Sequence, residues 1–220
     1  GHVKRTAQRP LATGAIPAQH ALLLFLGLIT FAGLLILFLN RATQILAVGG
    51  LALAVLYPFM KRWTHLPQVV LGAAFSWGIP MAWSAHQANA PAEAWLMFIS
   101  SLLWIVAYDT EYAMVDRDDD LKIGVKSTAI LFGDLDRLMI GILQASALLG
   151  FLLLGMALGY KHLYYVGLTL MAGLFIYQGW LIRDRQRDAC FEAFRNNIWV
   201  GMCLLPVSYT HLRAHETPRY

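Results

Sequence analysis

Residues 108–128 read YDTEYAMVDRDDDLKIGVKST, and the rest of the chain is organised around this acidic stretch. Eight of the thirteen acidic residues fall between Asp109 and Asp136, in a sequence that is otherwise apolar. At about 100° per residue on a helix, Asp109, Asp116 and Asp120 lie within roughly 40° of one another, and Asp118 points the other way. Stacked carboxylates repel each other unless a cation neutralises them. Because all three side chains offer oxygen ligands, the pattern predicts a Mg²⁺ site that substrate phosphate completes.

Two alternatives for this stretch involve no catalysis. One is a solvated acidic loop between helices, but the run continues directly out of the apolar segment 92–115, and carboxylates at a membrane helix end are functional candidates. The other is an EF-hand whose loop starts at Asp116. That loop requires Gly at its sixth position and Glu at its twelfth, where this chain has Leu121 and Ser127. The second alternative therefore fails.

The composition identifies the broad class of protein. Of the 220 residues, 58% are hydrophobic and only 14% are charged, and the mean hydropathy is +0.55. Soluble proteins carry about one quarter charged residues, so the sequence indicates an integral membrane protein. Cys190 and Cys203 have no CxxC or Cys/His spacing, so we predict neither a disulfide nor a zinc site. The net charge of +4 resides in short loops and gives no reason to expect nucleic acid binding.

Seven apolar segments of spanning length predict an all-α, multi-spanning membrane helix bundle in one domain, residues 1–206. Residues 1–19 are polar and basic, and no cleavage pattern marks them as a signal peptide. The predicted helices cover 20–39, 43–60, 67–85, 92–115, about 136–159, 162–182, and 196 onward.

Loop charges predict the orientation of the bundle. Thirteen basic loop residues fall on one side of this arrangement, and only Arg41 and Lys161 fall on the other. This positive-inside asymmetry predicts that the acidic stretch faces the cytoplasm. The predicted cytoplasmic segments are 1–19, 61–66, 116–136 and 183–195.

Local signals refine the ends of the helices. Gly124, followed by a possible N-cap at Ser127 and Thr128, predicts a turn and a short helix ahead of the fifth span. Three prolines, Pro58, Pro67 and Pro80, are candidates to break or kink helices. From about residue 207 the sequence turns polar and loses its helical apolar period, so we interpret residues 207–220 as a non-native tail.

The acidic stretch resembles the second aspartate-rich motif of the UbiA family of intramembrane aromatic prenyltransferases, and in particular its members that prenylate 4-hydroxybenzoate. The similarity extends over GHVKRTAQRPLATG, YPFMKRWTHLPQVVLGAAFSWGIPMAW and RDRQRDACFEAFRNN, and so covers nearly the whole chain to about residue 205. The resemblance implies Mg²⁺-dependent transfer of a polyprenyl group from its diphosphate to the ring of 4-hydroxybenzoate, ortho to the hydroxyl, in ubiquinone biosynthesis.

The family has nine helices and a first motif of the form NDxxDxxxD, which the resemblance places immediately before Gly1. We therefore expect the chain to be N-terminally truncated, with seven of nine helices present. On this view, half of the metal-binding carboxylates are missing, and we expect residues 1–220 alone to be inactive.

The resemblance also implies roles for individual residues. Asp109, Asp116 and Asp120 would hold Mg²⁺, with the metal acting as a Lewis acid on the diphosphate. Basic side chains on the same face would bind the diphosphate oxygens, although membrane-surface anchoring explains any one of them equally well. These diphosphate-binding candidates are Lys4, Arg5, Arg9 and Lys126.

Aromatic residues and one cation complete the implied site. Tyr108 and Tyr112, with Trp104 beside them, would stabilise an allylic cation through their π faces, although interfacial aromatic belts are a commoner reason for such residues. Arg62 matches the family's proposed partner for the acceptor carboxylate, and Lys61 is the alternative.

Other functions fit the sequence less well. A UbiA-superfamily enzyme with another aromatic acceptor is the runner-up. The CDP-alcohol phosphotransferase motif is absent. A membrane cation transporter would place carboxylates near the bilayer midplane, whereas this cluster lies at a helix end. The expected partners are polyprenyl diphosphate, 4-hydroxybenzoate and membrane lipid.

Overall fold

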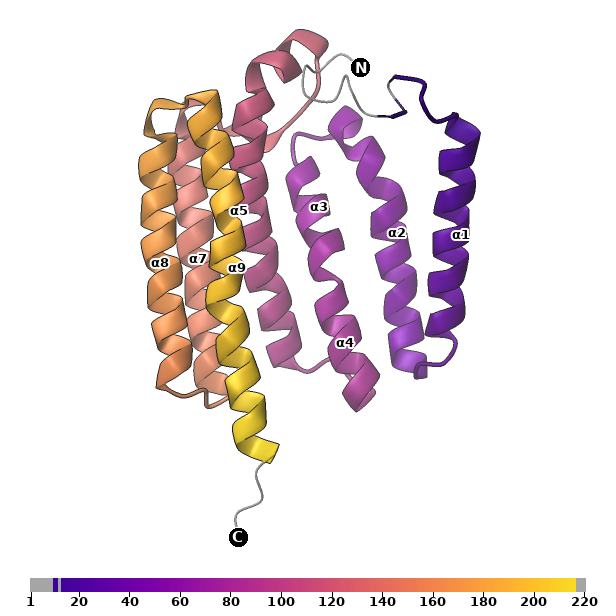
Figure 1. Cartoon of the computed structure of the whole chain (residues 1–220), viewed down its shortest axis with the longest axis vertical. Coiled ribbons are helices and arrows are strands. Elements are labelled where there is room, and N and C mark those ends of the chain that lie inside the picture. The colour runs from indigo at the N-terminus through magenta and orange to yellow at the C-terminus, as the bar shows by residue number, and fades with distance from the viewer. Residues whose placement is uncertain (1–9, 12, 217–220) are drawn as a thin grey trace.

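The computed structural model describes residues 10, 11 and 13–216, with side chains through residue 204. These residues form a bundle of roughly parallel helices without a strand (Figure 1). The helices are α1 (Ala18–Ile36), α2 (Arg41–Trp63), α3 (Pro67–Ser76), α4 (Gly78–Gln87), α5 (Ala92–Ile123), α6 (Thr128–Phe132), α7 (Asp136–Ala157), α8 (His162–Leu181) and α9 (Arg187–Glu216), with short 3₁₀ turns η1 (Gly133–Leu135) and η2 (Ile182–Asp184).

The seven predicted spans all appear as helices or as a helix pair. Within the described residues, five stretches are long and apolar enough to cross a membrane, namely α1, α2, α5, α6 to α7, and α8 with η2. The other two predicted spans correspond to the pair α3 and α4 and to the long helix α9. The fold is therefore the all-α membrane bundle that the apolar pattern predicts.

The predicted single helix over 67–85 is broken, which corrects the expectation of one continuous span. Helix α3 ends at Ser76 and α4 begins at Gly78. Pro80 lacks the N–H that would bond to the carbonyl of Ser76, so the regular ladder cannot continue through this point. Pro58, in contrast, lies inside α2 without ending it, and Pro67 occupies the first turn of α3.

Helix α5 is the central element of the bundle. It packs against α3 and α4 on one side and against α7 and α9 on the other (Figure 1). Its interior face carries buried small residues such as Ala94, Ala107 and Ala113, which let neighbouring helices approach closely. The functional stretch is therefore held on the helix with the most neighbours.

A second apolar cluster joins α7, α8 and α9. The ring of Tyr164 lies against Gly155, where a Cβ atom would collide with it, and its hydroxyl donates to the carbonyl of Phe151 at 2.7 Å. Only a glycine at position 155 allows this approach of α8 to α7. The outer faces of α1 and α2, in contrast, expose many Leu, Ile and Phe side chains, as expected for surfaces in contact with lipid.

The link between α5 and α7 folds as its local signals predict. Gly124 ends α5 in the left-handed conformation, with φ of 71°, and the Ser127 hydroxyl accepts the N–H of Ile130 at the start of α6. The Lys126 N–H donates to the carbonyl of Lys61 at 3.2 Å. This bond fixes the acidic end of α5 beside the turn that follows α2.

Helix α9 starts earlier than predicted. It begins at Arg187, nine residues before the predicted start at residue 196, and it continues to Glu216. The polar start is possible because it lies at the end of the bundle, where Arg187 pairs with Asp118 and Asp119 of α5. Residues 207–216 are helical despite their polar sequence, and their non-native origin stays a prediction.

Candidate functional site

The carboxylate face of α5 follows directly from the helix being unbroken through Ile123. Asp109, Asp116 and Asp120 thus lie on one face, as the spacing predicts. Asp109 and Asp116 are half-buried, and Asp120 is only 3% exposed. The sequence therefore places three carboxylates along the last turns of a helix that leads out of the apolar bundle.

Lys61, at the end of α2, places a positive charge beside this face. The Lys61 ammonium stabilises the negative charge of Asp109 and of Asp120. The Asp116 carboxylate repels the same two negative charges. The Lys61 side chain is half-buried, whereas its neighbour Arg62 is exposed. Of the two cations predicted for the acceptor carboxylate, the structure brings only Lys61 to the aspartates.

The donor set fits a hard cation that takes few protein ligands. Among the described residues, the buried Oδ2 atom of Asp120 has no hydrogen-bond partner, and a buried carboxylate oxygen is costly to leave in that state. No group of three His, Cys, Asp or Glu side chains within the described range is close enough to enclose a metal by itself. Mg²⁺ usually binds one or two carboxylates and keeps water and phosphate ligands, so this arrangement suits it.

The other two aspartates of the DRDDD run have a different partner. Arg187, at the start of α9, contacts Asp119 at 3.3 Å and Asp118 at 3.4 Å. Lys122 lies 3.9 Å from Asp119. The run is thus divided: Asp116 and Asp120 face the side of α2, and Asp118 and Asp119 face α9.

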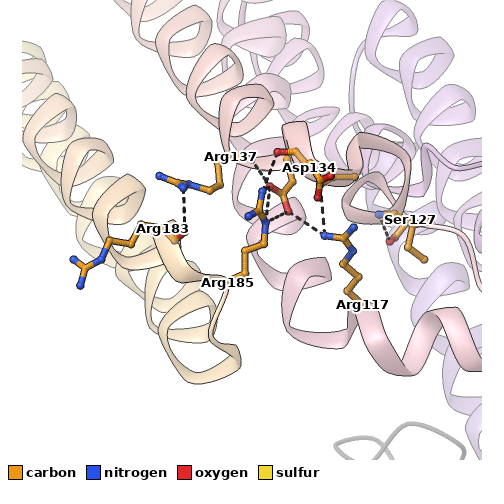
Figure 2. A network of polar contacts seen from close by, with 9 residues as sticks. Arg117, Ser127, Asp134, Arg137, Arg183 and Arg185 are labelled. Carbon is orange, nitrogen blue, oxygen red and sulfur yellow. Dashed lines mark hydrogen bonds and ion pairs between the residues drawn. The ribbon is translucent and has the colours of Figure 1, made fainter.

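A buried ion pair ties the loops beside the site together (Figure 2). The carboxylate of Asp136 is fully buried and accepts the Arg185 guanidinium, with Nη2 to Oδ1 at 2.8 Å and Nε to Oδ2 at 3.0 Å. Arg117 reaches the same carboxylate at 3.4 Å. Arg185 also donates to the carbonyl of Asp134, and Arg137 to that of Arg183. The end of α5, the start of α7 and the turn after α8 therefore meet at the Asp136 carboxylate.

An aromatic stripe runs along α5 next to the carboxylate face. Trp104 and Tyr108 make an edge contact with ring centres 6.0 Å apart. Phe194 of α9 lies 5.9 Å from Tyr108 and 4.8 Å from Tyr112. Trp104, Tyr108 and Phe194 line a recess of about 370 Å³, together with Arg195, Asn197 and Ile198. The predicted aromatic side chains are therefore brought together.

The predicted basic residues are placed less uniformly. Lys126 donates from its ammonium to the carbonyl of Trp63 at 3.2 Å, so it supports the turn between α2 and α3. Lys4, Arg5 and Arg9 lie outside the described residues. Three of the four segments predicted to share one membrane side meet at one end of the bundle. Hydrogen bonds or ion pairs join 61–66 to 116–136 and 183–187 to 116–136.

The sequence pattern assigned no role to three residues that the structure makes prominent. Asp136 and Arg185 are far apart in sequence and look like ordinary loop charges. Glu111 is fully buried in the middle of α5. A carboxylate inside an apolar segment is itself a signal of function, so Glu111 was the one that the sequence could have indicated.

Comparison with known proteins places this arrangement in a family. A model of the UbiA prenyltransferase family matches residues 1–201. The 4-hydroxybenzoate octaprenyltransferase of Escherichia fergusonii is 55% identical over 214 residues, which are 96% of this chain and 74% of that protein. The enzyme of the same name from Tolumonas auensis is 59% identical over 204 residues, covering 93% of this chain and 71% of the relative.

A solved structure has the same fold. The apo structure of a UbiA homolog from Aeropyrum pernix K1 superposes with a TM-score of 0.83 at 26% identity, over 95% of this chain and 78% of that one. The family match, the identity to these relatives and the shared bundle agree. The chain therefore belongs to the UbiA prenyltransferase family.

Proposed function

We propose that the protein takes part in Mg²⁺-dependent transfer of a polyprenyl group from its diphosphate to the ring of 4-hydroxybenzoate, ortho to the hydroxyl. The observation that carries this proposal is the carboxylate face of α5, where Asp120 has a buried oxygen without a hydrogen-bond partner among the described residues. The acceptor is inferred from the relatives, which are named 4-hydroxybenzoate octaprenyltransferases. An enzyme of the same superfamily with another aromatic acceptor is the alternative.

The first step is departure of the diphosphate. Asp116 and Asp120, with Asp109 beside them, would hold Mg²⁺, which when bound neutralises charge on the leaving oxygens. Lys61 is close enough to these carboxylates to contribute a further positive charge. The carbon–oxygen bond breaks and its electron pair stays with the diphosphate. In our proposal Lys4, Arg5 and Arg9 bind the diphosphate as well, and Lys126 supports the turn that carries Lys61.

The second step is attack on the allylic carbon. An electron-deficient prenyl group is stabilised by π faces in a water-poor pocket. Tyr108, Tyr112 and Trp104 are assigned this role, since two of them line the aromatic recess and the third contacts Phe194 at its edge. The ring carbon ortho to the hydroxyl forms the new carbon–carbon bond and releases one proton.

A direct assay separates this function from cation transport. Membranes that contain the protein with an added N-terminal segment carrying an NDxxDxxxD motif are incubated with polyprenyl diphosphate, Mg²⁺ and radiolabelled 4-hydroxybenzoate, and label in the lipid fraction is counted. Purified protein in liposomes is tested in parallel for Mg²⁺ flux. We expect label in lipid and no flux above that of empty liposomes. Flux without label would support the transporter, and label only with a different aromatic acid would support another acceptor.

Arg62 is our candidate for the acceptor carboxylate, because it is exposed beside the turn that carries Lys61. Arg62→Ala is expected to raise the KM for 4-hydroxybenzoate by about tenfold to 150-fold, matching a lost charge-assisted hydrogen bond of about 1.5–3 kcal/mol. The KM for the prenyl diphosphate should change little. Steady-state kinetics with each substrate varied in turn provides the measurement.

Two further variants sharpen the test of Arg62. Arg62→Lys keeps the charge but loses the planar fork, so it should recover part of the affinity. Lys122→Ala removes an exposed cation from the same end of the bundle and should leave both KM values unchanged. Equal changes in both KM values of Arg62→Ala would reassign this residue to general positioning.

We also propose that the acidic end of the bundle faces the cytoplasm of a bacterial inner membrane. Lys122 and Lys161 are both exposed and lie at opposite ends of the bundle. In a Cys203→Ser background, Lys161→Cys should react with a membrane-impermeant thiol reagent added to intact spheroplasts, and Lys122→Cys should react only after lysis. The reverse labelling pattern would show that the orientation is wrong.

A further inference from the structure

The feature that the proposed reaction leaves unused is a buried polar chain around Glu111. Oε1 of this carboxylate accepts the Gln144 amide of α7 at 3.3 Å, and Oε2 accepts the Asn197 amide of α9 at 3.1 Å. Gln144 also donates to Gln178 of α8 at 2.8 Å, and Gln178 donates to Asn196 at 2.9 Å. Both hydrogen bonds that Glu111 receives from described side chains come from neutral amides. A carboxylate in this setting is costly within a membrane bundle and calls for a function.

Trp104 fixes which atoms donate and which accept at one end of this series of hydrogen bonds. The indole N–H of Trp104 donates to Oδ1 of Asn197 at 2.8 Å. An indole can only donate, so the Asn197 oxygen must face Trp104 and its NH₂ group must face away. That NH₂ group donates to the backbone carbonyls of Ala193 at 3.1 Å and Phe194 at 3.3 Å and also points at position 111, where a second NH₂ group would meet it donor against donor. Glu111 places an acceptor there, whereas glutamine in the same pose would put NH₂ against the NH₂ of either Asn197 or Gln144.

The hydrogen bonds of Glu111 connect it to the aromatic recess through Asn197 and Trp104. Trp104 and Asn197 both line it, and Tyr108 holds its edge contact with the Trp104 ring. We propose that Glu111 is a positioning residue: acting through Asn197, it fixes the Trp104 ring as a wall for the prenyl group of the diphosphate substrate. This inference rests on the proposed function, because it assigns the recess to the prenyl chain. Glu111 itself does not touch the substrate.

A pair of substitutions at Glu111 and Asn197, called the double exchange below, distinguishes a positioning role of Glu111 from a role in packing alone. Glu111→Gln alone and Asn197→Asp alone each break the bond between the two residues. Combined, Glu111→Gln/Asn197→Asp reverses donor and acceptor: the introduced glutamine would donate to the introduced aspartate, which would still accept the Trp104 N–H. Gln144 keeps its acceptor, and the net charge is unchanged. The bonds from Asn197 to the Ala193 and Phe194 carbonyls are lost, and a carboxylate oxygen faces both carbonyls instead, so rescue is expected to be partial.

The first readout is the state of Trp104, independent of any substrate. With 5-fluorotryptophan incorporated, the Trp104 resonance is assigned by its loss in Trp104→Phe. We expect Glu111→Gln and Asn197→Asp to shift or broaden this ¹⁹F signal, and the double exchange to return it toward its original position. The matched control is Gln178→Met, which cuts the far end of the same buried chain and should leave the signal in place. An unmoved signal in Glu111→Gln would overturn the positioning role.

The second readout is ligand binding, with Mg²⁺ present and two probes compared. Geranyl diphosphate contains a prenyl group and inorganic diphosphate does not. Glu111→Gln should weaken geranyl diphosphate binding about fivefold to tenfold, as for the loss of one hydrogen bond, and leave inorganic diphosphate binding unchanged. Equal losses for both probes, or an equal loss in Gln178→Met, would overturn the inference. The unchanged protein could bind inorganic diphosphate but not geranyl diphosphate, which would contradict the proposed prenyl transfer. The effect of Glu111 on Trp104 would then still be supported by the ¹⁹F result.

Discussion

Asp120→Asn is expected to lower the rate of prenyl transfer by about 10²-fold or more, since a bound metal supplies several kcal/mol of charge stabilisation and each 1.4 kcal/mol is tenfold in rate. Asparagine keeps the size of the side chain and one oxygen but removes the negative charge. Asp120 is the best position for this test, because its buried Oδ2 atom has no hydrogen-bond partner in the described part of the chain. Asp116→Asn should have a similar effect.

Two measurements make this prediction decisive. Transfer is assayed in a form that carries an NDxxDxxxD motif ahead of Gly1, and Mn²⁺ binding is followed by electron paramagnetic resonance in the chain as it stands. The control is Asp118→Asn, two positions away on the opposite face, where the side chain is 72% exposed and pairs with Arg187. Near-normal turnover of Asp120→Asn at saturating Mg²⁺, or an equal loss in Asp118→Asn, would contradict the metal assignment.

Asp136→Asn is expected to lower the free energy of unfolding by about 2–3 kcal/mol, because hydrogen bonds to a charged group contribute about 1.5–3 kcal/mol and the exposed parts of both guanidinium groups stay solvated. The carboxylate is fully buried, and both the Arg185 and Arg117 guanidinium groups point at it. An asparagine NH₂ group would face at least one guanidinium N–H, donor against donor. The change should also free the segments between α5 and α7 and between α8 and α9.

The structure supplies a matched control for this variant. Asp184 pairs with Arg183 at 3.0 Å, but both side chains are largely in solvent, at 65% and 45% exposed. Asp184→Asn should therefore cost at most about 1 kcal/mol. Unfolding is followed by helical circular dichroism in mixed micelles with increasing sodium dodecyl sulfate. A loss in Asp136→Asn no larger than that in Asp184→Asn would show that the ion pair contributes little to stability.

The two ion-pair systems bear on the proposed site through α5. Arg187 engages Asp118 and Asp119, and Asp136 engages Arg117. In these contacts Arg117, Asp118 and Asp119 are paired with residues of α7 and α9, on the side of α5 away from Lys61. The end of α5 is thus held from the side of α7 and α9, and Asp116 and Asp120 are left on the side where diphosphate is proposed to bind.

Several features of the molecule follow from sequence alone. The apolar runs predict the spans because backbone groups in a membrane must be satisfied within helices, which ties span length to residue count. The shared face of Asp109, Asp116 and Asp120 follows from helical periodicity, which held because α5 is unbroken. The turn at Gly124 and the cap at Ser127 are local chemistry and appear as predicted.

The errors have equally physical causes. The run 67–85 is mostly apolar, so hydropathy alone predicts one span, whereas Pro80, named as a candidate to break a helix, follows the break between α3 and α4. The start of α9 was missed because its first residues are charged. One of them, Arg187, is stabilised by Asp118 and Asp119 on α5, which are 68 or more positions away in the chain.

The sequence by itself determined the helical bundle, the carboxylate face and the family, because each depends on local periodicity or on extended residue identity. Only the tertiary structure decided which charges meet: Lys61 lies by the aspartates while Arg62 is exposed, Arg185 binds Asp136, and Glu111 joins Gln144 and Asn197. Such pairs form between side chains on different helices, and their geometry is set by how the helices cross. Spacing along one chain segment carries no information about that crossing.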